Sequence, residues 1–375
     1  MNPAACFAEY DALGERRTGG PGDAASAAWL RGCAERAGAA AMLLPVAFTC
    51  FDPGAARLEV EGRVIEGLPL FDGGTTGAEG IVGALGPLGS DAPIGVVEME
   101  PRAASLPDNA FALARRGSGH AAIVAALRTR PDSLAPLNAH DHERPFGPPV
   151  LQVAGREARS LVALAGRGAR ARLVAEGLRT AGLSCNVRAE LPGAAPPLLL
   201  LTPRTSWWTS TAERAGGVLA WLTALGALAG ATRRRGVVAL ATCGHELGHI
   251  GAHRAFAAEP GIASDSALVL HLGANLGCAE DARLTVRSNV PGLADRMAEA
   301  LVTAGHPRAP LEVATGGKAN GEAHEIEARG GRYLSLIGHN PWFHAQEDRW
   351  PQCVALDRGA SIARAVALIA VAEAR

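Results

Sequence analysis

The second half of the chain consists of short apolar runs that alternate with longer helical segments. Apolar runs that lack a regular polar alternation are typical of strands buried on both faces of a parallel sheet. Strands are predicted at 197–201, 237–242, 267–272 and 333–337, a buried helix at 217–229 and an amphipathic closing helix at 358–374. This pattern predicts a three-layer α/β fold, in which helices cover both faces of a mixed, largely parallel sheet. Functional loops in such a fold follow the carboxyl ends of the strands.

The first half of the chain has a different texture. A helix is predicted at 24–37, where apolar residues recur at helical spacing after a Gly-Gly-Pro-Gly breaker. From residue 42 to residue 182, short runs rich in Val and Ile are separated by Gly, Pro and Asp, which predicts a small strand-rich unit. We therefore expect one α/β domain built from residues 1–41 and 183–375, and an inserted β-rich domain at 42–182.

Composition excludes several classes of partner. The formal net charge is −1, so no basic surface for nucleic acid is indicated. No run reaches the roughly 18 apolar residues that a membrane span needs, and the N-terminus lacks the pattern of a signal peptide. The seven cysteines are scattered, odd in number and form no CxxC pair, which disfavours a disulfide scaffold. We expect a cytoplasmic protein that contacts neither membrane nor nucleic acid.

The segment His245-Glu246-Leu247-Gly248-His249 matches the HExxH pattern. On a helix this spacing places two imidazoles one turn apart, where both bind zinc and the glutamate acts as general base. However, the segment follows a predicted strand almost directly, and Gly248 and Gly251 weaken the helix that this arrangement requires. A zincin-type metalloprotease, with Glu280 as a separate third ligand, therefore remains an alternative.

A second interpretation uses more of the chain. The same segment can be described as a strand, a glycine, two polar residues and the pattern x-Gly-x-x-Gly. This order is typical of a loop that turns a strand into a helix at a metal site. The stretch 236–252 resembles the Gly-Glu-Glu-x-Gly-x-x-Gly-Ser segment of the zinc aminopeptidases related to leucyl aminopeptidase and the transferrin-receptor ectodomain. Other segments similar to that family follow in its order, at 17–23, 185–193, 206–208, 213–218 and 343–348. The resemblance implies that the unit at 42–182 is a protease-associated insertion.

The resemblance also implies which metal ligands are kept and which are lost. The family binds two zinc ions, but Pro203, Thr205 and Gly273 stand at three of its ligand positions and offer no suitable side chain. His271 is close enough in sequence to be a substitute ligand. The residues that match the second zinc site are Glu213, Glu246 and His344. The glutaminyl cyclases, which are single-zinc relatives on this fold, use an Asp-Glu-His set at the same places, so one zinc ion or none is expected.

For several of the remaining residues the sequence allows either a catalytic or a structural role. His245 stands where the family has its general base, and a neutral imidazole can accept a proton from water near pH 7. His249 and His253 are expected on the exposed face of a helix. Asp348 either orients His344 or caps a turn. The aromatic side chains Trp207 and Trp342 either wall an apolar substrate pocket or belong to the core.

Three functions follow from these patterns. The first is an aminopeptidase-like metallohydrolase with at most one zinc, acting on a peptide or small amide, with cyclase-like acyl transfer as a variant. The second is a pseudo-peptidase that serves as a binding or scaffolding module, because a fold is kept more easily than its chemistry. The third is the zincin-type metalloprotease.

Overall fold

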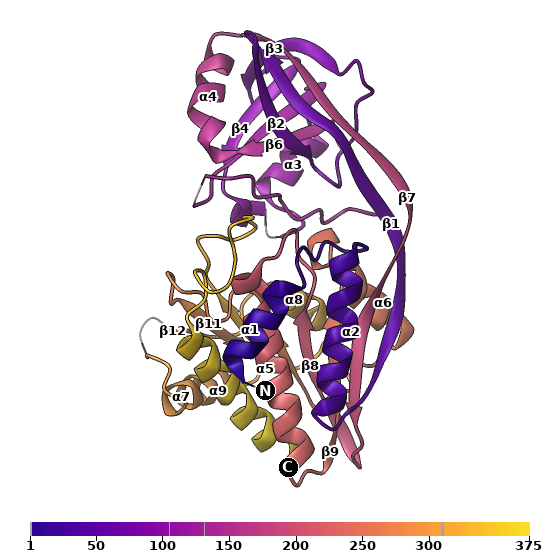
Figure 1. The fold of residues 1–375 in the computed structure, drawn as a ribbon, viewed down its shortest axis with the longest axis vertical. Coiled ribbons are helices and arrows are strands. Elements are labelled where there is room, and N and C mark those ends of the chain that lie inside the picture. The colour runs from indigo at the N-terminus through magenta and orange to yellow at the C-terminus, as the bar shows by residue number, and fades with distance from the viewer. Residues whose placement is uncertain (1, 105, 131, 309–310) are drawn as a thin grey trace.

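A computed structural model describes residues 2–104, 106–130, 132–308 and 311–375. Figure 1 shows a larger unit that contains both chain ends and a smaller unit stacked on it. Two long antiparallel strands, β1 (Ala40–Val60) and β7 (Arg170–Leu191), run through both units and pair from Ala40–Glu190 to Val60–Ala171. The predicted domain boundaries near residues 42 and 182 therefore fall inside continuous strands.

The larger unit is built on a mixed sheet with the strand order β7-β9-β8-β10-β13-β11-β12. Its four central strands are parallel, and they coincide with the four apolar runs of the sequence. Strand β7 pairs antiparallel with β9, and β11 pairs antiparallel with β13 but parallel with β12. The bounds are β8 (Ala195–Pro203), β9 (Arg235–Thr242), β10 (Leu268–Leu272), β11 (Leu284–Ser288), β12 (Leu311–Thr315) and β13 (Tyr333–Gly338).

Alternate residues of the central strands enter two different cores, which confirms the predicted three layers. Leu198 and Leu200 of β8 pack into one core, while Leu199 and Leu201 pack into the other. The first core is covered by α1 (Pro3–Ala12), α2 (Pro21–Arg36), α5 (Thr211–Gly230), α7 (Leu293–Thr303) and α9 (Leu356–Ala374), and the second by α6 (Ile250–Ala258) and α8 (Glu322–Glu327). None of the helices in the described ranges is long and apolar enough to cross a membrane.

The strands of the smaller unit continue the same sheet through β7, in the order β1-β2-β6-β5-β4-β3-β7, and the unit has its own apolar core. Its many strands agree with the strand-rich texture of the sequence. The smaller unit also contains two helices that the pattern did not predict. The elements are β2 (Arg63–Pro69), β3 (Ile81–Pro87), β4 (Ile94–Met99), β5 (Ala122–Leu127), β6 (Val150–Ala154), α3 (Ala110–Arg116) and α4 (Ala158–Gly166). The connection from β5 to β6 contacts the larger unit, where the Ala139 amide donates to the Glu246 carbonyl at 2.8 Å. This contact brings the smaller unit against the carboxyl edge of the larger sheet.

Candidate metal centre

The loop after β9 is shaped by residues in the left-handed region of backbone space. Gly244, Gly248 and His249 have φ values of 67°, 74° and 58°, and a single 3-10 turn, His245–Leu247, lies between the two glycines. A Cβ atom at Gly248 would lie 2.3 Å from the carbonyl oxygen of His140, so glycine is required there. Helix α6 begins only after His249. The zincin alternative is therefore wrong, because its two histidines must lie on one continuous helix.

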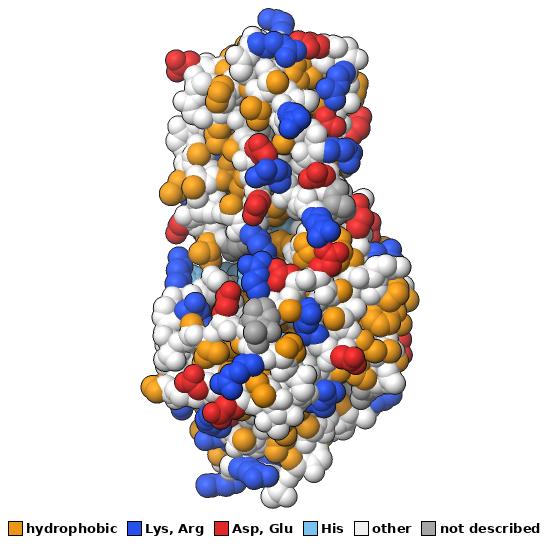
Figure 2. All heavy atoms as spheres, turned by 90° about the vertical axis from the view of Figure 1, so that its left-hand side faces the viewer, with side chains coloured by type: hydrophobic (Ala, Val, Ile, Leu, Met, Phe, Trp, Pro, Cys, Tyr) orange, Lys and Arg blue, Asp and Glu red, His pale blue; other side chains and the backbone are white. Residues whose placement is uncertain are grey.

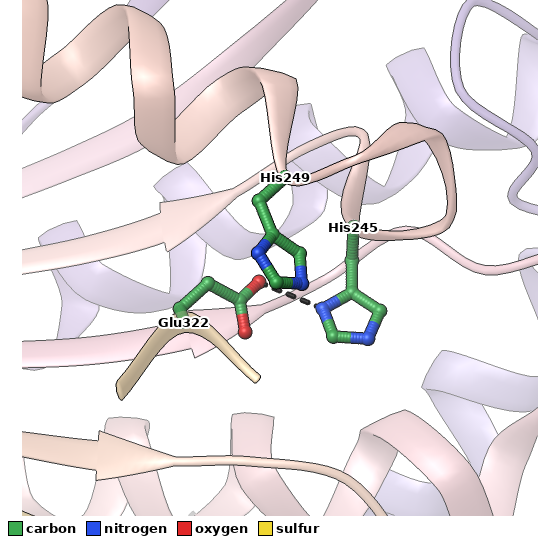
Figure 3. A group of neighbouring side chains, drawn as sticks. All are labelled: His245, His249 and Glu322. Atoms are coloured by element: carbon green, nitrogen blue, oxygen red, sulfur yellow. Dashed lines mark hydrogen bonds and ion pairs between the residues drawn. The ribbon is translucent and has the colours of Figure 1, made fainter. Parts of the chain in front are cut away.

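The same loop nevertheless brings the two histidines together with a carboxylate from a distant segment. The ring centroids of His245 and His249 are 4.8 Å apart. Glu322, the first residue of α8, places Oε1 at 2.9 Å from Nδ1 of His245. One ligand-type atom from each of the three residues lies within 4.8 Å of the others, and Figure 3 shows their side chains converging on one point. All three residues are buried, which corrects the expected exposed position of His249.

Surrounding side chains hold this group in place. His271 of β10 lies with Nε2 at 3.3 Å from Glu322 Oε2 and with Nδ1 at 2.8 Å from the Ser335 hydroxyl. Both of its ring nitrogens are therefore engaged, so His271 is arranged to orient Glu322 rather than to complete the ligand set. Glu325 lies 3.5 Å from Nδ1 of His249. Such outer contacts fix the tautomer and ring orientation of metal-binding histidines.

The protonation states of His245 and Glu322 suit metal binding, whereas the raised pKa of His249 opposes it. Burial lowers the pKa of His245 to about 3, so its imidazole is neutral at pH 7 and donates Nδ1–H to Glu322. Burial raises the pKa of Glu322, but the neighbouring histidines outweigh it and hold that pKa well below its ordinary value. For His249, burial lowers the pKa, while the hydrogen bond to Glu325 and the charge of Glu322 produce a net rise. His245 beside the ionised Glu322 is therefore in the state in which both can bind a cation, whereas His249 must lose a proton that its surroundings favour before it can bind one.

The group lines a cavity of about 450 Å³ between the two units. The smaller unit contributes Arg102, Ala103, Leu106, Asp108, Asn109 and Asn138, and the larger unit contributes the histidines, Glu322, Asn275 and Phe343, among others. Figure 2 shows Lys and Arg side chains at the waist of the molecule, around a recess in which histidine side chains are visible. A pocket bounded by two units beside a ligand cluster has the general form of a small-molecule site.

The two tryptophans predicted as pocket walls lie elsewhere. Trp207 is buried in a separate aromatic cluster, where its ring meets Phe71 edge-on at a centroid distance of 4.8 Å. Trp342 packs against the main core of the larger unit. The aromatic residue that lines the cavity is Phe343, next to Trp342 in sequence.

Two of the three predicted zinc ligands, Glu213 and His344, lie together in a second buried group. Glu213 Oε1 is 3.6 Å from His344 Nε2 and 2.8 Å from an Nη atom of Arg214, whose guanidinium is fully buried. His344 donates Nδ1–H to the Pro136 carbonyl at 2.5 Å, so its Nε2 carries the lone pair. Asp348 accepts hydrogen bonds from the amides of Ala212 and Glu213 and caps α5 instead of orienting His344. A fixed guanidinium therefore already balances the charge of Glu213.

The third predicted ligand, Glu246, has different neighbours. Its Oε1 accepts hydrogen bonds from the Thr18 hydroxyl at 2.6 Å and the Thr18 amide at 3.0 Å. Its Oε2 accepts from the Thr205 hydroxyl at 2.8 Å. Burial raises the pKa of Glu246 by more than these hydrogen bonds lower it. Both carboxylate oxygens are thus bound by the N-terminal loop and by the loop after β8.

Glu322 and His249 were missed in the sequence for different reasons. Glu322 lies in the stretch Asn-Gly-Glu-Ala-His-Glu, which shows no metal-binding spacing. His249 was visible as the last letter of HExxH, but it was placed on an exposed helical face. Only the left-handed backbone at Gly248 and His249 turns its imidazole inward.

Comparison with known proteins gives a clear result for the fold alone. No protein-family model matches the chain, and no curated protein sequence matches it. Among solved structures, the zinc aminopeptidase BSAP from Bacillus subtilis is 16% identical with a TM-score of 0.76, over 98% of this chain and 93% of that one.

Two further structures give the same picture. The aminopeptidase from Aneurinibacillus sp. strain AM-1 is 16% identical, with a TM-score of 0.72 over 97% of this chain and 92% of that one. A peptidase M28 precursor from Shewanella amazonensis SB2B is 15% identical, with a TM-score of 0.73 over 100% of this chain and 92% of that one. The chain therefore has the fold of the zinc aminopeptidases.

Proposed function

We propose that the protein is a hydrolase that uses a single zinc ion, held by His245, His249 and Glu322, to cleave a peptide or amide bond. The observation that carries this proposal is the convergence of two imidazoles and one carboxylate within 4.8 Å on the wall of a cavity. Two histidines and a glutamate with an open fourth position are a donor set that suits catalytic zinc. The three side chains are buried and pre-oriented, so the residues present fit the ion.

Each residue around the centre then has a defined task. A bound zinc ion supplies Lewis-acid polarisation of a carbonyl group and a water molecule of lowered pKa. His271 and Ser335 fix the direction of the Glu322 carboxylate, and Glu325 fixes the ring of His249. The smaller unit closes one side of the cavity and limits the access of bulk water.

Arg214 supports the expectation of no more than one ion. Its guanidinium lies against Glu213 with both side chains fully buried, and its Nε donates to the Thr205 carbonyl at 2.8 Å. A divalent cation beside Glu213 would be repelled by this fixed positive charge. The set Glu213, Glu246 and His344 stays a competing location for the ion. In that arrangement His245, with Nδ1 held by Glu322, would act as general base.

Metal content after zinc reconstitution tests the proposal. We expect one zinc ion per chain, lost in His249→Ala and retained in His344→Ala. The matched control is His253→Ala in α6, the helix that follows His249; the His253 side chain is 45% exposed, and the variant should retain the ion. Loss in His344→Ala with retention in His249→Ala would move the ion to the competing location. A reconstituted wild-type protein without zinc would overturn the proposed activity.

A non-catalytic binding module is the second candidate, and one observation favours it. Both carboxylate oxygens of Glu246 are satisfied by Thr18 and Thr205, and Arg214 balances the charge of Glu213, although neither oxygen of Glu213 has a hydrogen-bond partner among the described residues. If the cluster around Glu322 also binds no metal, the cavity would serve to bind a ligand without cleaving it. Zinc-dependent hydrolysis of aminoacyl and acyl amides of a fluorogenic amine, abolished in His249→Ala, would exclude this candidate.

A further inference from the structure

The wall of the cavity beside the proposed metal centre carries an excess of basic side chains. Arg102 from the smaller unit and Lys318 from the larger unit both line it, and each carries a positive charge at pH 7. Among the described residues of the wall, the carboxylates are Glu322, which belongs to the metal centre, and the exposed Asp108. A zinc ion would balance Glu322, so two cations would then face one carboxylate. Figure 2 shows basic side chains around the same recess.

Arg102 is held at the cavity wall and can be reached from the cavity. Its Cζ atom lies 5.2 Å from the centroid of the Phe343 ring, which lines the same cavity. One Nη atom donates to the Gly338 carbonyl at 3.4 Å. The side chain is partly rather than fully buried, so its guanidinium can meet a bound molecule. A carboxylate accepts two parallel N–H bonds from such a group, and these bonds are about twice as strong as bonds between neutral groups.

The surroundings of Arg102 favour a bound anion. Burial lowers the pKa of Arg102 and the neighbouring Arg283 lowers it further, while Asp281 and Glu213 oppose these shifts without cancelling them. A nearby negative charge favours the charged form of the guanidinium and would offset both effects. Attraction between opposite charges is also stronger at a partly buried group than in bulk water.

Lys318 is the only lysine in the chain, and the packing of its loop places it at the cavity. The adjacent Ala319 is fully buried, and its amide donates to Glu327 Oε2 at 3.1 Å. A Cβ atom at Gly321 would lie 3.2 Å from Cε1 of His271, so the loop packs directly against the site. Lys318 itself is exposed. Its ammonium group is carried by a flexible stem, so it can attract an anion in the cavity without a fixed contact.

We propose that the cavity recognises a carboxylate of the substrate, which forms an ion pair with Arg102 and is attracted by Lys318. The substrate class is then a short peptide or acylated amino acid that carries this carboxylate at its carboxyl end or on an acidic side chain. A peptide recognised by its free amino end would bring an ammonium group toward the same two cations. Asp108 is the one described carboxylate of the wall outside the metal centre that would attract it. This inference rests on the proposed function for the bond that is cleaved, but not for the binding of the carboxylate.

Calorimetry on the full chain tests the inference, with zinc first removed by chelation so that the probes are neither cleaved nor bound by the ion. The probes are N-acetyl-alanyl-alanine, its C-terminal amide, and alanyl-alanine amide, which are anionic, neutral and cationic. We expect the anionic probe to bind about tenfold more tightly than the neutral one, and the cationic probe to bind most weakly. Equal affinities of the anionic and neutral probes would overturn the inference.

A fourth probe, N-acetyl-alanyl-glutamic acid α-amide, separates the two sources of the carboxylate. If it binds more tightly than N-acetyl-alanyl-alanine, the carboxylate belongs to an acidic side chain. If it binds more weakly, the carboxylate belongs to the carboxyl end of a peptide.

Variants assign the preference to the two basic residues. Arg102→Met should reduce the anionic-to-neutral affinity ratio about tenfold, and Lys318→Met about threefold, because an exposed ion pair is weaker. Lys318→Arg keeps the charge and should keep the ratio. The matched control is Arg130→Met, which removes a 73% exposed cation from the neighbouring cavity of about 590 Å³ and should leave the ratio unchanged. An unchanged ratio in both Arg102→Met and Lys318→Met would overturn the inference. A loss in Arg130→Met without a loss in Lys318→Met would overturn it too, because the carboxylate would then lie in the neighbouring cavity.

Chemical modification reports on Lys318 separately, since the chain has no other lysine side chain. Acetic anhydride should acetylate Lys318 in the unliganded protein, and peptide mapping by mass spectrometry gives the rate. N-acetyl-alanyl-alanine should slow this reaction several-fold, whereas its amide should not, and acetylation of the α-amino group of the chain is the internal reference. Equal rates with both probes would refute the role of Lys318.

The outcomes distinguish this inference from the proposed function. Zinc-dependent hydrolysis of amides without a carboxylate preference that depends on Arg102 would overturn the inference and leave the hydrolase standing. A carboxylate preference that Arg102→Met abolishes, in a protein that binds no zinc, would support the inference and refute the hydrolase.

Discussion

Replacing Arg214 with methionine should destabilise the protein strongly, because it leaves Glu213 as an unbalanced charge in the core. The two charged groups are 2.8 Å apart, and both side chains are fully buried. At an effective dielectric constant of 20, two unit charges at this distance attract by about 6 kcal/mol. The gross attraction is reduced by the cost of burying the ions. Measured losses on removing one partner of a buried pair are about 3–5 kcal/mol, which is the range we expect for Arg214→Met.

The pH dependence of the loss has a definite sign. In the wild type, burial raises the pKa of Glu213, but the charge of Arg214 outweighs it and the net shift is downward. Without Arg214 the folded-state pKa of Glu213 should rise above its unfolded value. A carboxyl group with a raised folded-state pKa contributes stability at low pH that is lost as pH rises through that pKa. The deficit of Arg214→Met should therefore shrink as pH is lowered from 7 to 5.

Urea unfolding followed by tryptophan fluorescence measures the effect, and Trp221 provides a fully buried reporter in the same helix. The matched control is Arg254→Met, which removes an ion pair of equal length, 2.8 Å, between side chains that are 50% and 37% exposed. That change should cost less than about 1 kcal/mol. The double variant Glu213→Gln, Arg214→Met should regain part of the lost stability, because no charge is left buried. The charge balance is refuted if Arg214→Met lowers the free energy of unfolding by no more than Arg254→Met does. It is also refuted if adding Glu213→Gln to Arg214→Met lowers that free energy further.

Two further predictions concern the same region of the fold. Burial raises the pKa of Asp348 to about 7 from an ordinary value near 3.8, so the folded state holds an extra proton between these values. Stability should fall as pH rises from 4 to 7, and Asp348→Asn should flatten that slope in thermal unfolding; an unchanged slope would contradict the assignment. Within α5, Gly216→Ala places a Cβ atom 1.5 Å from the Leu276 carbonyl oxygen and should cost about 3 kcal/mol. Gly226→Ala in the same helix meets its nearest neighbouring atom only at 4.0 Å and should gain up to about 1 kcal/mol in chemical unfolding, so equal effects of the two substitutions would refute the packing argument.

The sheet of the larger unit was predictable because its central strands are buried on both faces. The runs around Leu199 and Leu240 are apolar throughout, since neither face of these strands meets water. The antiparallel strand β11 and the edge strand β12 were missed. Polar residues interrupt both segments, Thr285 and Arg287 in β11 and Glu312 and Thr315 in β12, so neither has a continuous apolar signal. The length of β1 and β7 was missed for the same reason, since each leaves the core between the two units.

The site was less predictable, because its geometry depends on backbone conformation and on distant segments. The resemblance to aminopeptidases drew attention to the loop after β9 and to His245, and the structure places that loop at the carboxyl edge of the sheet. Sequence spacing could not reveal that Gly248 and His249 adopt left-handed conformations. Nor could it bring Glu322 to His245 across 77 residues of chain. Both facts are products of tertiary packing, which local patterns do not record.

Charge balance separates the two groups of carboxylates and favours one of them as the metal centre. Glu213 lies against the permanent charge of Arg214, and Glu246 is bound by neutral donors at both oxygens. Glu322 is fully buried, yet its closest partner, His245, is neutral at pH 7 because its pKa is about 3. An ionised carboxylate in the interior is costly unless a cation lies beside it. Glu322 therefore has only titratable histidines beside it, including His249 with its raised pKa, and not a permanent cation such as Arg214. A zinc ion shared with His245 and His249 would supply that permanent charge. If His249→Ala and Glu322→Gln left zinc affinity and stability in the presence of zinc unchanged, this distinction between the two groups would be wrong.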